Sequence, residues 1–100
     1  MRMLYVFKSP SCAACVEAEP FLAAFEKENR ARVPVIRLNP FLRNWNIAGF
    51  APDSTPSYAM VERSGTTTGV QLLGKVEGRI LTLEELRSFV ENPEAFGGGK

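Results

Sequence analysis

The sequence contains no histidine, and this absence excludes several kinds of chemistry. A histidine general base, a nucleophile paired with histidine and a histidine metal ligand are all ruled out. Two cysteines are too few for the set of disulfides that stabilises many small secreted domains. Twelve lysines and arginines against eleven aspartates and glutamates leave a net charge of +1, which provides no strong field of one sign. We therefore expect no nucleic acid and no anionic membrane among the partners.

Long hydrophobic runs are also missing. No stretch approaches the roughly 18–20 apolar residues of a membrane span. The apolar run from Leu4 to Phe7 is too short for a signal peptide and is not followed by a small-residue cleavage site. We therefore expect a cytoplasmic protein, monomeric, with one domain over residues 1–96 and a flexible glycine-rich tail over residues 97–100.

The pattern of apolar residues predicts an α/β fold whose elements run strand, helix, strand, short helix, strand, strand, helix. Short runs rich in β-branched and aromatic residues are typical of buried strands. The predicted strands cover residues 3–7, 33–38, 57–62 and 70–76. A helix between the first two strands makes them parallel. The turn Ser64–Gly65 makes the last two an antiparallel hairpin.

Three segments are predicted to be helical. Residues 12–28 have apolar residues at helical spacing. Thr82 and Glu85 form a capping box, so the last helix begins after Thr82 and ends before Pro93. The segment 39–50 is ambiguous, and we assign it a short helix opened by a proline.

Cys12 and Cys15 are the strongest chemical signal in the sequence. Their spacing places both sulfurs in the first turn of a helix, beside backbone amides that favour a thiolate. There the pKa of a thiol can fall from about 8.5 to roughly 3.5–7.5. Cys12 lies nearer the helix terminus and is predicted to attack a disulfide, and Cys15 to resolve the mixed disulfide. This reaction requires no metal and no cofactor.

Two other interpretations of the cysteine pair are open. Free cysteines are often buried, so the pair could be purely structural. The pair could also be half of a zinc site, but structural zinc takes four ligands and this chain offers two cysteines and no histidine.

The ordered set of motifs resembles the thioredoxin family. The motifs are the strand run from Leu4 to Phe7, Cys12-x-x-Cys15 at a helix start, Pro20, Thr55–Pro56 before a strand, and a terminal strand–strand–helix unit. The resemblance covers about residues 3–92, without the additional N-terminal strand and helix of full-length thioredoxins. It implies the thioredoxin fold, with a central four-stranded mixed sheet flanked by helices.

The resemblance also implies roles for residues around the cysteines. Pro56 would be a cis-proline facing the disulfide, and Thr55 would present backbone groups to an extended substrate segment. Pro10 and Ser11 would border the same shallow groove, which Trp45 could join if it does not belong to the core. Arg37 matches a basic family position and could support a nearby anion, or be a solvated surface residue.

This sequence departs from the family pattern at three places. Ser11 replaces a tryptophan, and Ala13–Ala14 replaces Gly-Pro, from which we expect a less reducing pair than in thioredoxin. Val6 stands where the family has a buried aspartate that assists proton transfer. Cys15 would then lose its proton to water or to a carboxylate, and the candidates are Glu17, Glu19 and Asp53.

The expected function is therefore a thiol–disulfide oxidoreductase, a protein-disulfide reductase. Its partners would be a disulfide-containing protein substrate and a thiol reductase as electron donor. One alternative is a glutaredoxin-like reductase that depends on glutathione, although the Gly-Gly and acidic pair that would grip glutathione is not apparent. The other is a redox-inert adaptor with the thioredoxin fold that binds a partner through the same groove.

Overall fold

The structure, a computed structural model, describes residues 1–30, 32–41, 46–63 and 69–94. Trp45, the expected turn at Ser64–Gly65 and the expected tail over residues 97–100 lie outside the described residues. Among the described residues, no helix has the length and apolar character needed to cross a membrane.

Four strands form one mixed sheet in the order β2-β1-β3-β4. The elements are β1 (Arg2–Phe7), α1 (Ala13–Glu28), β2 (Val35–Leu38), β3 (Ser57–Arg63), β4 (Val70–Val76) and α2 (Leu83–Glu91). Strand β1 pairs parallel with β2 and antiparallel with β3, and β3 pairs antiparallel with β4. The predicted α/β class and the mixed four-stranded sheet are confirmed.

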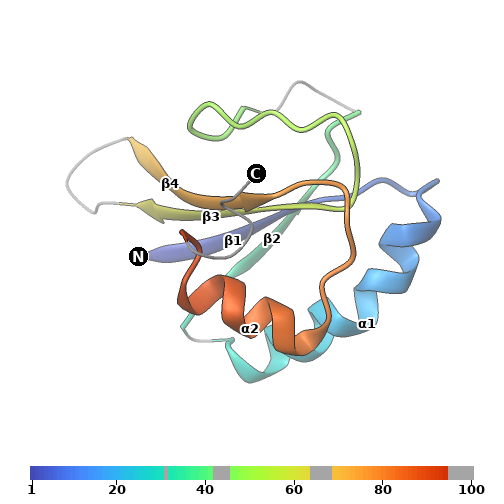
Figure 1. The fold of residues 1–100 in the computed structure, drawn as a ribbon, viewed down its shortest axis with the longest axis horizontal. Helices are drawn as coiled ribbons and strands as arrows, with labels where there is room; N and C mark the ends of the chain where they lie inside the picture. Colours follow the sequence, from blue (N-terminus) through green and yellow to red (C-terminus); the bar gives the residue numbers. More distant parts are fainter. Residues whose placement is uncertain (31, 42–45, 64–68, 95–100) are drawn as a thin grey trace.

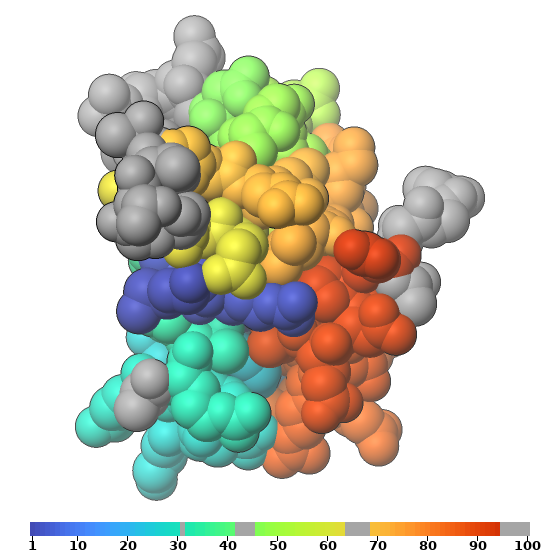
Figure 2. All heavy atoms as spheres, turned by 90° about the vertical axis from the view of Figure 1, so that its left-hand side faces the viewer, coloured from blue at the N-terminus to red at the C-terminus, as the bar shows by residue number. Residues whose placement is uncertain are grey.

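Both helices cover the same face of the sheet, and residues 46–56, which precede β3, lie over the other face (Figure 1). In the space-filling view, β3 and β4 lie between this segment above and α2 below (Figure 2). The fold therefore has a helical layer, a sheet, and a covering layer of irregular chain.

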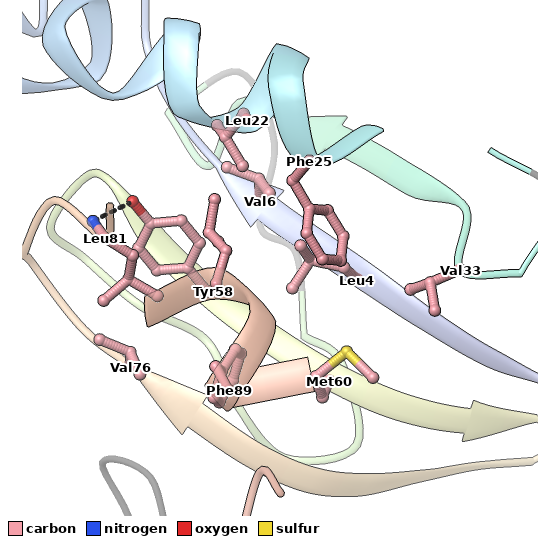
Figure 3. Close-up of a cluster of buried hydrophobic side chains, with 11 residues drawn as sticks. Leu4, Val6, Leu22, Phe25, Val33, Tyr58, Met60, Val76, Leu81 and Phe89 are labelled. Atoms are coloured by element: carbon pink, nitrogen blue, oxygen red, sulfur yellow. Dashed lines mark hydrogen bonds between the residues drawn. The ribbon is translucent and has the colours of Figure 1, made fainter. Parts of the chain in front are cut away.

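The larger hydrophobic core lies between the sheet and the helices (Figure 3). Leu4 and Val6 of β1 meet Leu22 and Phe25 of α1 there, and all four side chains are almost completely buried. Tyr58 is also fully buried, and its hydroxyl accepts a hydrogen bond from the backbone amide of Leu81. This bond satisfies the polar end of the ring inside the core.

The capping box at the start of α2 is confirmed. Thr82 is the N-cap residue, its side chain accepts from the amide of Glu85, and the Glu85 carboxylate accepts from the amide of Thr82. The apolar face of α2 then buries Leu86 and Phe89 in the core.

The short helix expected over residues 39–50 is absent from the described part of that segment, residues 39–41 and 46–50. Ile47 and Phe50 instead exchange two backbone hydrogen bonds of 2.9 Å across a tight turn. Ala48 and Gly49 at its centre have φ angles of 52° and 93°, a left-handed conformation that a helix cannot contain. The turn brings Phe50 edge-on against Phe7, with ring centroids 5.7 Å apart, on the sheet face opposite the helices.

Candidate functional site

Cys12 and Cys15 are joined by a disulfide at the N-terminus of α1, with Cα atoms 5.2 Å apart. Cys12 is the N-cap residue in an extended conformation, and its Sγ accepts a hydrogen bond of 3.0 Å from the amide of Cys15. Its carbonyl oxygen also accepts from the amide of Val16. The first turn of α1 therefore aims a backbone donor at the Cys12 sulfur, where it would stabilise a thiolate.

The two sulfurs differ in accessibility. Cys15 is 2% exposed and belongs to the buried face of α1. Cys12 is only partly buried. A second molecule can therefore reach Cys12 more readily than Cys15.

The loop from β1 to α1 holds Cys12 in place. Ser9 is buried, and its carbonyl oxygen accepts from the amide of Cys12 at 3.3 Å. Lys8 fixes the start of the loop, since its amide donates to the carbonyl of Leu38 in β2. Pro10 and Ser11 are exposed beside Cys12.

The segment before β3 reaches the cysteines from the other side. The Thr55 carbonyl oxygen lies 3.6 Å from Cys12 Sγ, although the residues are 43 positions apart in the sequence. The Thr55–Pro56 peptide bond is cis, Pro56 is buried, and Thr55 is partly exposed. Ser57 anchors this segment, because its hydroxyl donates to the Ser54 carbonyl and accepts from the amide of Gly78.

Arg37 lies on β2 and contacts α1. Its guanidinium binds Glu19 at 2.7 Å and Glu26 at 3.0 Å. Partial burial would lower the pKa of Arg37, but the hydrogen bonds and charges of Glu19 and Glu26 outweigh it and raise that pKa. Arg37 is thus a partly buried, ion-paired residue linking β2 to the helix that carries the cysteines.

A charged cluster beside the site was not predicted from the sequence. Besides Arg37, Glu19 also binds Lys8, at 2.8 Å. Burial acts to raise the pKa of Glu19, but hydrogen bonds from Arg37 and Lys8 dominate and hold it below its ordinary value. A carboxylate held in its ionised form is a weak base, which disfavours Glu19 as the proton acceptor for Cys15.

Val16 is a second feature that the sequence analysis did not single out. It is 68% exposed, a large value for an apolar side chain, and lies one turn after Cys12 on α1. In contrast, Val6 is fully buried in the core, so this position offers no proton acceptor. No group of three or more potential metal-binding side chains occurs within the described ranges.

A groove of about 400 Å³ opens beside the loop that leads to Cys12. It is lined by Lys8, Ser9, Pro10, Arg37, Leu38 and Asn39. A larger hollow, of about 620 Å³, involves Arg2 and Arg87 and none of the residues around the cysteines. Of the residues predicted to border a substrate groove, only Pro10 lines this one; Ser11, Thr55 and Pro56 do not, and neither do the cysteines.

Comparison with known proteins gives matches to solved structures only. No protein-family model matches the sequence, and no curated protein sequence matches it. A thioredoxin-2, described as a component of the malaria parasite protein secretion machinery, is 12% identical with a TM-score of 0.74, covering 91% of this chain and 82% of that one. Chloroplastic thioredoxin z is 16% identical with a TM-score of 0.63, and the match covers 95% of this chain and 80% of that chain.

A thioredoxin of Trichomonas vaginalis is 15% identical with a TM-score of 0.64, covering 90% of this chain and 77% of that chain. At such low identities the likeness concerns the backbone arrangement. The chain has the thioredoxin fold, as the motifs led us to expect.

Proposed function

We propose that this protein is a thiol–disulfide oxidoreductase that reduces protein disulfides with the dithiol of Cys12 and Cys15. The observation that carries the proposal is the position of Cys12 at the N-cap of α1, with the Cys15 amide donating to its sulfur. The disulfide between an accessible and a buried cysteine supports a division of labour between them. The thioredoxin fold is compatible with this chemistry but does not by itself prove it.

The reaction consists of two exchange steps. The Cys12 thiolate attacks one sulfur of the substrate disulfide, a mixed disulfide forms, and the other substrate sulfur leaves as a thiolate. Cys15 then loses its proton to water and attacks Cys12 Sγ. The Cys12–Cys15 bond forms, the mixed disulfide breaks, and the second substrate sulfur leaves. Two electrons pass to the substrate, whose thiolates take up protons from water.

Thr55, Pro56, Pro10 and Ser11 would receive the substrate around Cys12. The Thr55 carbonyl is already in contact distance of the sulfur, so an extended segment bound to the backbone at Thr55 would bring its own disulfide to Cys12. Recognition through the backbone tolerates varied side chains and suits a protein substrate. A dithiol reductase would restore the Cys12–Cys15 dithiol, and a cytoplasmic, monomeric protein remains our expectation.

The test is the reduction of a disulfide-bonded protein by dithiothreitol, with and without this protein. We expect the wild type to accelerate the reaction and Cys12→Ser to abolish the acceleration. Pre-reduced Cys15→Ser, mixed with the substrate in the absence of dithiothreitol, should accumulate a mixed disulfide that later addition of dithiothreitol releases. Ala24→Ser is a matched control, since it adds the same hydroxyl at an exposed position of α1 away from the cysteines and should retain activity.

The alternatives give different outcomes in the same assay. A redox-inert adaptor would bind a partner without accelerating reduction. When glutathione replaces dithiothreitol as the reductant, a glutathione-dependent enzyme would accelerate the reduction strongly, whereas the proposed dithiol reductase would not. A Cys15→Ser variant that traps no substrate would refute the assigned roles.

A further inference from the structure

A cluster of four charged side chains links the helix of the cysteines to the ends of two strands. Glu19 of α1 binds Lys8, which follows β1, at 2.8 Å. Glu19 Oε2 accepts from Nη2 of Arg37 in β2 at 2.7 Å. Glu19 Oε1, the oxygen that binds Lys8, also accepts from Nε of Arg37 at 3.4 Å. Glu26, seven residues further along α1, binds Arg37 at 3.0 Å. Glu19 is thus the one member of this cluster that contacts both cations.

The cluster lies close to the dithiol. Glu19 follows Cys15 by four residues, a rise of about 6 Å along the helix. Lys8 begins the short loop to Cys12, and Lys8 and Arg37 line the groove beside Pro10 of that loop. The three side chains of Lys8, Glu19 and Arg37 are only 29–36% exposed, so water and salt screen their charges incompletely.

Glu19 balances the two cations of this cluster. With Glu19 ionised, Lys8 and one side of Arg37 are neutralised by a carboxylate on the same helix as the cysteines. Without it, Arg37 would retain Glu26 whereas Lys8 would lose its ion-pair partner within the described structure. The net charge next to the sulfurs would then become more positive.

We propose that Glu19, acting through Lys8 and Arg37, sets the reduction potential of the Cys12–Cys15 pair. The inference rests on the proposed redox function. Reduction of the disulfide takes up two electrons, and two protons from water give the dithiol. Cys12 then releases its proton to water and becomes a thiolate. A thiolate is stabilised by nearby positive charge, and a more stable reduced form means a higher potential. Glu19 therefore keeps the pair more reducing than its cations alone would make it.

The test compares wild type, Glu19→Gln and Lys8→Met in redox buffers of reduced and oxidised glutathione, with the dithiol fraction measured by alkylation and mass spectrometry. We expect Glu19→Gln to shift the equilibrium constant roughly three- to tenfold toward the dithiol, about 14–30 mV at about 29.6 mV per tenfold. Lys8→Met should shift it toward the disulfide. The double variant should return near wild type, because the two removed charges are opposite and adjacent.

Glu26→Gln is the matched control. It removes the other carboxylate bound to Arg37, but about 10 Å further along the helix from Cys15 than Glu19, so its shift should stay below about twofold. Equal shifts for Glu19→Gln and Glu26→Gln, or no shift for Glu19→Gln, would overturn the inference. If Glu19→Gln does not fold, the test rests on Lys8→Met. A reduction potential of Lys8→Met that equals or exceeds that of the wild type contradicts the proposal. A wild type that fails to cycle between dithiol and disulfide would instead contradict the proposed function.

Discussion

The backbone amide of Cys15 donates a hydrogen bond to Cys12 Sγ over 3.0 Å, inside the disulfide ring that joins the two residues. The bond has a structural role, because a helix begins with amides that lack a partner and an N-cap side chain satisfies one of them. In the proposed reaction it would also have a chemical role, because an amide donor at this position stabilises a thiolate. The capping of α1 and the proposed activation of Cys12 therefore depend on the same two atoms.

Cys12 of the reduced protein should react as a thiolate at neutral pH. We expect its rate of alkylation by iodoacetamide to reach half of its maximum below pH 8.5, the midpoint of an ordinary cysteine. Cys15 should react far more slowly, because only 2% of it is exposed. Peptide mapping by mass spectrometry separates the two sites. In urea both midpoints should move toward about 8.5, and identical midpoints in the folded and unfolded chain would contradict the role of the helix terminus.

Val16 should contribute to binding of a protein substrate. Its side chain is 68% exposed one turn after Cys12, so a protein that reaches the sulfur would cover it. Burying that surface is worth about 1–2 kcal/mol, so the uncharged substitution Val16→Ser should lower kcat/KM for a protein disulfide about 5- to 30-fold. A small aromatic disulfide does not cover this surface, and its rate of reduction should change less than about twofold.

The control for Val16 is Ala24→Ser. Ala24 is also exposed on α1 but lies two turns further from Cys12, so the same added hydroxyl should leave the rates with both substrates unchanged. Equal losses for the protein and the small disulfide would mean that Val16 affects the cysteines themselves and does not bind substrate.

Features encoded by neighbouring residues could be predicted from the sequence, because their physical cause is local. The four strands are short segments rich in aliphatic, β-branched or aromatic residues, and the start of α2 is specified by Thr82 and Glu85 three positions apart. The position of the cysteines in the first turn of a helix also follows from local spacing. The approach of Thr55 to Cys12 spans 43 positions, and only the resemblance to a family suggested it.

The failures have equally specific causes. Ile47 and Phe50 are three residues apart, as on one face of a helix, and Ala48 between them is a good helix former. The local signals of the left-handed turn are Gly49 and Asn46, whose side chain accepts a hydrogen bond from the amide of Gly49, and packing of Phe50 on Phe7 stabilises the turn. The contacts of Glu19 with Lys8 and Arg37 depend on how α1 lies on the sheet, which no local pattern specifies.

Gly74 of β4 should be intolerant of a side chain. A Cβ atom there would overlap the carbonyl group of Pro93, which is backbone and cannot rotate away. Gly74→Ala should therefore push the segment after α2 off the sheet and lower the free energy of unfolding by about 1–3 kcal/mol. Urea unfolding followed by circular dichroism measures the change.

Gly69→Ala is the comparison for Gly74. A Cβ at Gly69 has no atom within 4 Å, so its substitution should change stability by less than about 0.5 kcal/mol. If the two alanine variants unfold at the same urea concentration, then the approach of Pro93 does not restrict the residue at position 74.

The ion pairs of Glu19 should make stability depend on pH in the acidic range. Hydrogen bonds from Arg37 and Lys8 outweigh burial and lower the pKa of Glu19 from its ordinary value of 4.5. At a pH near 4.5, Glu19 is therefore protonated more often in the unfolded chain than in the folded one. The stabilisation is therefore complete above about pH 4.5 and is lost as pH falls through the lowered pKa of the folded state.

Glu19→Gln should accordingly be less stable than wild type at pH 7, and the difference should shrink as the pH falls below 4.5. Urea unfolding at pH 7, 5, 4 and 3 measures it. Glu17→Gln is the control, because Glu17 is exposed on the same helix and makes no ion pair with the described residues. A Glu19→Gln deficit that persists undiminished at pH 3 would mean that glutamine disturbs packing, since protonated Glu19 has already lost the charge that Lys8 and Arg37 bind.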